Sequence, residues 1–188
     1  MILTAMLSKT WQDVESAYAE TPIEIYTEDR NRNQAAFVLA FYKSLEPRLN
    51  NLHAMYDARC LSDQSYRPNF IIWTGVDEPI VIFMGDVKFA PGSLTEIMRG
   101  ISNLSEYASR SMTEVLSSHD STEIMKVSPN VEYGYFVVSD LSYASISQRI
   151  ASQILSPDDL ARFHFAYASI NRIGNFSYQN PLPTGVDA

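Results

Sequence analysis

Residues 67–88 read RPNFIIWTGVDEPIVIFMGDVK, a stretch in which two short apolar runs, FIIW and IVIFM, flank TGVDEP. Runs of this length that are rich in Ile, Val and aromatic residues are typical of β-strands, and Gly, Asp and Pro between them favour a turn. The stretch therefore predicts a β-hairpin. Its second strand ends on Asp86-Val87-Lys88, and because side chains alternate along a strand, Asp86 and Lys88 should lie on the same face of the sheet.

Three further elements are predicted before this hairpin. A short helix is expected at about 9–19. A second helix is expected at about 28–46, because Thr27 is a good N-cap and four apolar residues follow at helical spacing. Alternation of apolar and polar residues over 52–60 predicts a strand. The apolar residues of the second helix are Phe37, Phe41, Leu45 and Leu49.

After the hairpin, Ser93 and Glu96 form an S-x-x-E capping box that predicts the start of a long helix, 94–117. A strand is expected at 131–139 and a helix at about 143–155, and Ser156-Pro157 predicts the start of another helix. The order of elements predicts an α/β (α+β) fold in which one mixed sheet is flanked by helices.

The composition of the whole chain fits one globular domain of 188 residues, since 46% of its residues are hydrophobic and 19% are charged. The net charge of -8 repels polyanions, so a nucleic-acid contact needs a local basic patch or a metal ion. This counts against a general DNA-binding module. The single cysteine, Cys60, suits a reducing cytosol, and no apolar run reaches the roughly 20 residues of a membrane span. We expect a cytoplasmic protein without membrane contact.

The order of the elements and the residues on the hairpin resemble the PD-(D/E)xK superfamily, the restriction-endonuclease-like nucleases. In that family a helix with an acidic residue precedes a hairpin that bears Pro-Asp and then (Asp/Glu)-x-Lys, and a helix and a strand follow. Here Pro68-Asn69 occupies the Pro-Asp position, Asp86-Val87-Lys88 matches D-x-K, and Glu28 matches the acidic residue. The resemblance implies a restriction-endonuclease-like core with a four-stranded mixed sheet flanked by helices.

In this interpretation the core covers residues 26–140 of a single domain, 1–188. Residues 1–25 form an N-terminal helical arm, and residues 141–188 form C-terminal helices and a tail.

The activity that the resemblance implies is hydrolysis of phosphodiester bonds in DNA or RNA with Mg²⁺ or Mn²⁺ as cofactor. Such hydrolysis needs a hard cation that neutralises the developing charge and lowers the pKa of an attacking water. The carboxylate of Asp86 suits this cation, and Lys88 on the same face can orient the water or stabilise the charge. The resemblance adds Glu28, Asn69 and the main-chain carbonyl of Val87 as metal ligands, and the first two also as catalytic residues.

Asn69 departs from the family pattern. An amide oxygen is a neutral ligand, so Asn in place of Asp removes one negative charge and weakens Mg²⁺ binding. Three interpretations stay open: an active variant that relies on Asp86 and Glu28, a degenerate nuclease, and a chain mutated to block catalysis. Asp63 and Asp77 are near enough in sequence to supply a displaced carboxylate, although both also suit solvated turns.

Three arginines are candidates for nucleic-acid contacts. Arg67 directly precedes Pro68, whereas Arg99 and Arg110 should lie about three turns apart on one face of the predicted helix. The alternative for all three is a solvated surface position.

Structural explanations compete with several of these assignments. Asp86 and Lys88 can form an exposed ion pair at a strand end, and Glu28 can be an acid favoured by the helix dipole. An aromatic cluster near the C-terminus suits core packing as well as base stacking. The histidines show no metal-ligand spacing, so a zinc site is not expected. The aromatic residues are Phe163, Phe165, Tyr167 and Phe176.

Two functions therefore remain, and a purely structural role on an unrelated α/β fold is the third possibility. The first is a metal-dependent nuclease whose partner is DNA or RNA, and which self-associates or recruits another protein to assemble a basic groove. The second is a catalytically degenerate protein of the same fold that acts as an acidic binding, regulatory or inhibitor partner.

Overall fold

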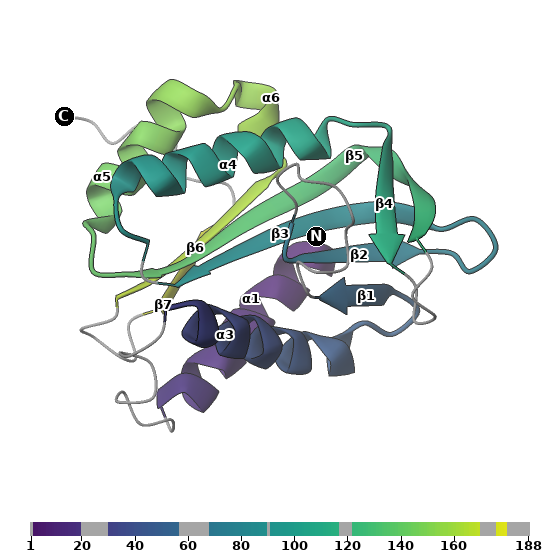
Figure 1. The fold of residues 1–188 in the computed structure, drawn as a ribbon, viewed down its shortest axis with the longest axis horizontal. Helices are drawn as coiled ribbons and strands as arrows, with labels where there is room; N and C mark the ends of the chain where they lie inside the picture. The colour runs from purple at the N-terminus through teal and green to yellow at the C-terminus, as the bar shows by residue number, and fades with distance from the viewer. Residues whose placement is uncertain are drawn as a thin grey trace.

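The structure, a computed structural model, describes residues 2–19, 30–56, 68–89, 91–116, 122–169 and 176–179. Its strands are β1 (His53–Tyr56), β2 (Phe70–Thr74), β3 (Ile80–Phe89), β4 (Met112–Leu116), β5 (Thr122–Ser139), β6 (Phe163–Ser169) and β7 (Phe176–Gln179). Six of them lie side by side in the order β1-β2-β3-β5-β6-β7, and β4 pairs with β5 outside this order. The result is an α+β fold with one mixed, open sheet (Figure 1). The expected sheet of four strands is wrong.

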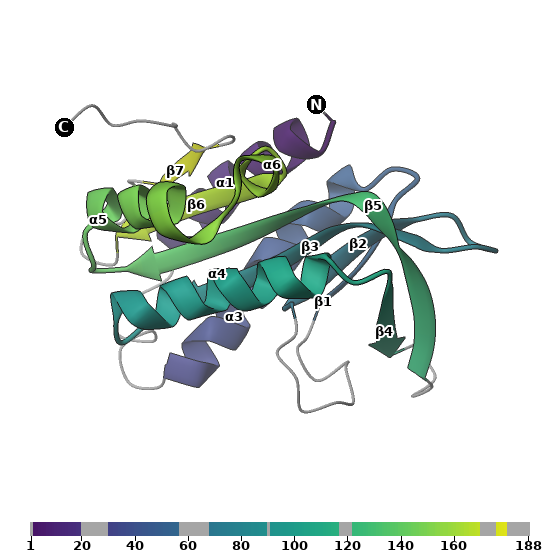
Figure 2. The same ribbon diagram turned by 90° about the horizontal axis from the view of Figure 1, so that it is seen from above.

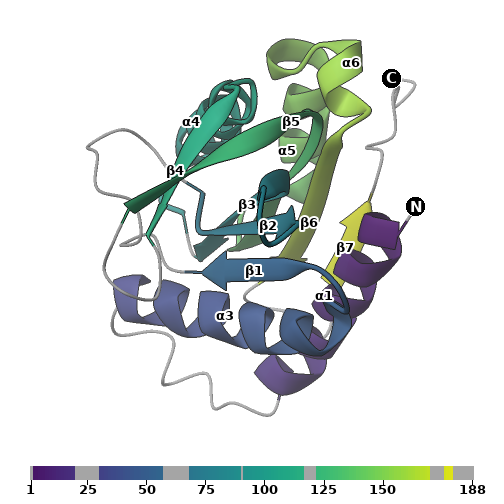
Figure 3. The ribbon, with the colours of Figure 1, turned by 90° about the vertical axis from the view of Figure 1, so that its right-hand side faces the viewer.

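Helices cover both faces of this sheet, as the end-on view shows (Figure 3). On one face, called the α1 face, lie α1 (Ile2–Ala19), α3 (Arg30–Leu45) and the short 3-10 helix η1 (Glu46–Arg48). On the other, called the α4 face, lie α4 (Leu94–Ala108), α5 (Tyr143–Arg149), the π-helical turn η3 (Ile150–Ile154) and α6 (Pro157–Leu160). None of the helices in the described ranges is both long and apolar enough to cross a membrane.

The predicted hairpin is confirmed. β2 and β3 pair antiparallel, with Phe70 opposite Gly85 and Ile71 opposite Met84. Gly75 in the connecting turn has a positive φ, a conformation that glycine adopts without steric cost. β3 then pairs parallel with β5, and β5 pairs parallel with β6. β3 and β5 thus lie in the middle of the sheet and are buried on both faces.

Each face of the sheet has its own hydrophobic core. The α4-face core contains Ile97, Ile101 and Leu104 of α4 together with Met84 and Tyr135 of the sheet. Figure 2 shows α4 running alongside β3 and β5. The α1-face core is rich in aromatic side chains, and its members include Trp11, Phe37, Phe41, Phe70, Phe83, Phe89 and Phe136.

Two sequence predictions fail in the second half of the chain. The helix expected over 94–117 starts correctly, since the Ser93 hydroxyl accepts a hydrogen bond from the Glu96 N–H, but it ends at Ala108. The next residues form β4 because they pair with β5, and this tertiary pairing overrides local helix propensity. The segment 141–188, for which helices and a tail were expected, also contains β6 and β7.

Candidate functional site

Asn69 and Asp86 meet where β2 begins and β3 approaches its end. Continuing the β2–β3 register by one residue beyond Phe70 and Gly85 places Asn69 directly opposite Asp86. The N–H of Val87 donates hydrogen bonds to Oδ1 of Asn69 (2.8 Å) and to Oδ1 of Asp86 (3.0 Å). The two side-chain oxygens therefore converge on one backbone donor. Asn69, Asp86, Val87 and Lys88 are called the strand-end cluster below.

Lys88 and Asp86 form an ion pair within this cluster, with 3.7 Å between Lys88 Nζ and Asp86 Oδ2. The Asp86 side chain is only 1% exposed, and that of Lys88 is 22% exposed. The alternative of a fully exposed surface pair is therefore wrong. Burial makes the carboxylate costly unless charges and hydrogen bonds compensate it, and Lys88 and the Val87 N–H supply such compensation.

Pro68 shapes the backbone side of the cluster. The same register, extended by one more residue, places Pro68 opposite Val87. Proline has no N–H, so it cannot donate a ladder hydrogen bond to the Val87 carbonyl. The Asn69 side chain accepts from the Val87 N–H at this position. Pro68 and Asn69 thus stand directly before the first residue of β2. At this position the Val87 N–H is bonded by a side-chain oxygen and not by the backbone of a longer strand.

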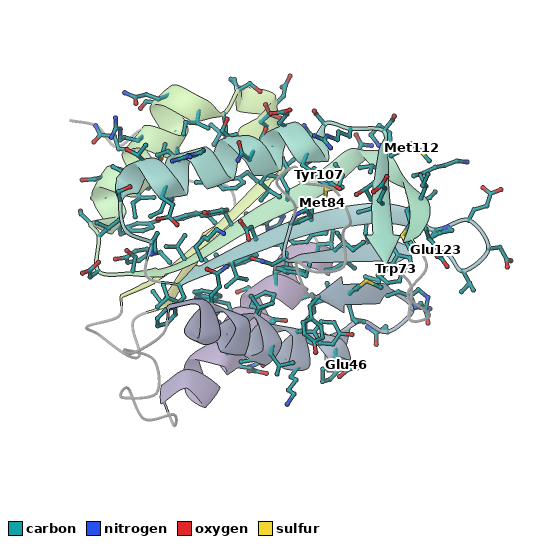
Figure 4. All side chains as sticks on the ribbon, viewed as in Figure 1. Glu46, Trp73, Met84, Tyr107, Met112 and Glu123 are labelled. Carbon is teal, nitrogen blue, oxygen red and sulfur yellow. The ribbon has the colours of Figure 1, made fainter. Side chains whose placement is uncertain are left out.

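The side chains of Asp86 and Lys88 lie on the α4 face of the sheet, whereas the Val87 side chain belongs to the α1-face core. Alternation along β3 puts Asp86 on the same face as Met84, which belongs to the α4-face core. Tyr135 of β5 is the parallel register partner of Asp86, and an ideal Cβ added to Gly100 of α4 would lie 2.2 Å from its hydroxyl. Figure 4 places Met84 beneath the end of α4 at which Tyr107 lies. Asp86 therefore lies on an interior strand, next to the strand whose Tyr135 packs closely against α4.

Other predicted site residues do not join this cluster. Arg99 is exposed on α4, but Arg110 lies beyond the end of that helix, with its guanidinium 4.6 Å from the centre of the Tyr107 ring. The prediction that both arginines share one helix face is therefore wrong, because the helix is shorter than expected. Asp77 is exposed in the β2–β3 turn, at the opposite end of the hairpin from Asp86.

Several predicted residues lie outside the described ranges, so the structure does not place them. Among these are the proposed metal ligand Glu28, the arginine Arg67 and the alternative carboxylate Asp63. Of the four side chains expected to converge, the structure brings together Asn69, Asp86 and Lys88.

The strand-end cluster fits a divalent cation in the type of its ligands but not in their charge. The Asp86 carboxylate and the Asn69 amide oxygen are hard ligands of the kind that Mg²⁺ and Mn²⁺ bind. The cluster carries one negative and one positive charge, however, and in the described ranges no three His, Cys, Asp or Glu side chains are grouped to hold a metal ion. A further acidic ligand is needed, and Glu28 is the candidate that the sequence offers.

The structure also contains a buried histidine, paired with a carboxylate, that the sequence prediction missed. His164 of β6 is fully buried on the α1 face, shares a hydrogen bond with Glu132 of β5, and packs edge-on against Phe83. The hydrogen bond with His164 holds the pKa of Glu132 below its ordinary value. The alternation of Phe163, His164 and Phe165 is the sequence signal for a strand that places His164 opposite the aromatic residues. The aromatic residues on the other face of β6 belong to the core, which favours packing over base stacking.

Comparison with known protein families, with curated proteins and with solved structures gave no match in any of the three.

Proposed function

We propose that the protein is a metal-dependent nuclease of the PD-(D/E)xK type that hydrolyses phosphodiester bonds of DNA or RNA at the strand-end cluster. The observation that supports this most directly is the convergence of Asn69, Asp86 and Lys88 at neighbouring strand ends on one face of the sheet. Asn69 directly precedes β2 and the D-x-K motif lies on β3, so their meeting depends on the hairpin register.

Each residue of the cluster has a distinct role in this proposal. Asp86 is the charged ligand for Mg²⁺ or Mn²⁺, and Asn69 with the main-chain carbonyl of Val87 adds neutral oxygen ligands. The bound cation would neutralise phosphate charge and lower the pKa of the attacking water. Lys88 has a partly exposed side chain, and its ammonium is suited to hold a phosphate oxygen or to orient the water. Glu28 supplies the second carboxylate.

The neutral amide of Asn69 makes weak cation binding part of the proposal. Replacing one carboxylate ligand by an amide lowers the attraction for a dication, and the remaining carboxylate is already paired with Lys88. We therefore expect activity to require higher cation concentrations than an all-carboxylate site, and Asn69→Asp to lower that requirement.

The test is cleavage of single- and double-stranded DNA and of RNA, with Mg²⁺ or Mn²⁺ titrated into each reaction. The wild type should cleave at least one substrate, Asn69→Asp should cleave faster, and Asp86→Asn and Lys88→Ala should be inactive. Lys126→Ala is the matched control, because Lys126 is a surface lysine that is 65% exposed and pairs with an exposed Glu78. No cleavage by the wild type or by Asn69→Asp, on any substrate, would exclude the nuclease.

A second candidate is a catalytically degenerate protein of this fold that acts as an acidic binding, regulatory or inhibitor partner. The observation that favours it is the charge balance of the cluster, in which one carboxylate faces one ammonium and a neutral amide. The net charge of -8 suits a surface that binds a basic protein. Wild-type calorimetry with Mn²⁺ separates the two candidates, since binding that Asp86→Ala abolishes contradicts the degenerate protein.

Location and assembly complete the proposal. The lone cysteine supports a cytoplasmic location. Self-association or a protein partner would help an acidic chain to assemble a basic groove for nucleic acid, and a flat salt dependence of binding would argue against phosphate contacts.

A further inference from the structure

The side-chain amide of Asn69 has two ends, and the structure shows which way each of them faces. Its Oδ1 accepts the N–H of Val87 at 2.8 Å. A backbone N–H bonds only to an acceptor, so the oxygen faces β3 and the NH₂ group is turned away from that N–H. Among the described residues no group accepts a hydrogen bond from Asn69 Nδ2, and this atom is not fully buried. Asn69 therefore presents a hydrogen-bond donor that an aspartate would lack.

Lys88 places a charged donor close to this amide. Asn69 lies opposite Asp86 in the continued hairpin register, and Lys88 is two residues further along β3 on the same face as Asp86. Diagonal neighbours of this kind are about 7–8 Å apart, which is within reach of a long side chain. The 3.7 Å between Lys88 Nζ and Asp86 Oδ2 is too long for a hydrogen bond, so the ion pair does not use the N–H donors of the ammonium.

The burial of the charged groups suits an anion at this surface. The Lys88 side chain is 22% exposed, whereas Asp86 is 1% exposed, so an anion can contact the lysine while the carboxylate stays away from solvent. Asp86 does not depend on Lys88 alone, because the Val87 N–H and a further interaction also hold it. Phosphate oxygens commonly bind to lysine ammonium groups and to asparagine side chains. One cationic and one neutral donor side by side therefore fit an oxyanion.

We propose that the NH₂ group of Asn69 is a phosphate-binding donor, which together with Lys88 holds a non-bridging oxygen of a nucleic-acid phosphodiester without a divalent cation. The inference rests on the proposed function for the identity of its ligand. The Asn69 oxygen keeps a second lone pair, so the donor role adds to the ligand role proposed above. Asparagine in place of aspartate thus gives the site a phosphate contact instead of a group that would repel phosphate.

The experiment titrates sodium phosphate, and separately an oligothymidylate, into ¹⁵N-labelled wild-type protein in EDTA and follows the side-chain NH₂ signals by NMR. The Asn69 signal is assigned through bonds from its own backbone amide, so no variant is needed to identify it. It should shift with saturation for both probes, because the NH₂ group donates to phosphate oxygens. Sodium chloride at the same ionic strength should leave it in place.

Two variants separate the donor from the charge. Asn69→Asp keeps an acceptor for the Val87 N–H but lacks the donor, so it should bind oligothymidylate in EDTA roughly tenfold or more weakly than the wild type. The exchange variant Asn69→Asp/Asp86→Asn has the net charge of the wild type, but its amide lies at the buried position and should not restore binding. Asn51→Asp, which adds the same charge at an exposed position before β1, should bind like the wild type.

The outcomes separate this inference from the proposed function. An Asn69 signal that stays in place with both probes overturns the inference, whereas cleavage by the wild type would leave the nuclease intact. A saturable shift without cleavage in Mg²⁺ or Mn²⁺ supports the inference and removes the nuclease. A shift with phosphate and none with oligothymidylate contradicts a phosphodiester ligand. Wild-type affinity in Asn69→Asp or in the exchange variant also overturns the donor role, and if these variants do not fold, the wild-type titration decides.

Discussion

Substituting Gly100 by alanine tests how closely α4 approaches the strand that lies beside Asp86. An ideal Cβ at Gly100 would lie 2.2 Å from the Tyr135 hydroxyl oxygen and 2.7 Å and 2.8 Å from two ring carbons. Tyr135 is fully buried, so its ring has little room to move away. The glycine is therefore required by a close helix–sheet contact and not by backbone conformation.

Two opposing effects decide how far Gly100→Ala changes the free energy of unfolding. Alanine in a helix interior is favoured over glycine by about 1 kcal/mol. Overpacking of a tight core costs about 1–3 kcal/mol or more, and contacts as short as these belong at the upper end. We expect Gly100→Ala to lower the free energy of unfolding by about 2 kcal/mol, which corresponds to a fall in Tm on the order of 5 °C.

Urea denaturation followed by circular dichroism measures this change. Ser102→Ala, at an exposed position of the same helix, is the matched control and should be neutral or slightly stabilising. Combining Gly100→Ala with Tyr135→Phe removes the shortest contact, so the double variant should lose less stability than the two single variants added together. A Gly100→Ala protein as stable as the wild type would refute the close approach of α4 to β5.

Three further changes test other parts of the structure. An ideal Cβ at Gly85 would lie 2.1 Å, 2.3 Å and 2.8 Å from three carbons of the buried Phe70 ring. Gly85→Ala should therefore lower the free energy of unfolding in urea by about 2 kcal/mol. The hydrogen bond with His164 lowers the pKa of Glu132, so it stabilises the fold at pH values above the ordinary pKa of a glutamate. This stabilisation is lost as the pH falls through the lowered pKa of Glu132. Glu132→Gln should therefore flatten the acid side of the stability–pH curve, and an unchanged curve contradicts this. Burial raises the pKa of Tyr133 to about 12, so Tyr133→Phe should leave the ultraviolet tyrosine titration unchanged up to about pH 11.

Local signals in the sequence predicted the elements that local interactions determine. The hairpin follows from two apolar runs and a turn, and both predicted serine caps are present: Ser93 accepts from Glu96 N–H, and Ser156 accepts from Asp159 N–H. β4 could not be predicted in this way, because its residues become a strand only by pairing with β5. In β6 the aromatic residues Phe163, Phe165 and Tyr167 alternate with His164 and Ala166, which is typical of a strand. From the sequence alone these aromatic residues are interpreted only as a cluster, and no strand is predicted there.

The part of the candidate site that depends on local spacing along one strand could be predicted from the sequence. Asp86 and Lys88 share a face because strand alternation requires it, and their ion pair follows from that spacing. The burial of Asp86 could not be predicted from the motif, because β3 becomes an interior strand only by pairing with β5, a separate element later in the chain. The hydrogen bond that joins Asn69 to Val87 depends on the hairpin register and on Pro68, which only the folded strand ends reveal.

β5 has a consequence for the order in which the chain folds. It pairs with three strands, and its residue Phe136 lies roughly 50 residues along the chain from its register partner, Val87 of β3. The hairpin before it can form early and locally, but the central pairing must close a long loop before it gains any stability. During synthesis the backbone N–H and C=O groups on one edge of β3 therefore stay unpaired until β5 has left the ribosome, and an unpaired strand edge of this kind favours aggregation.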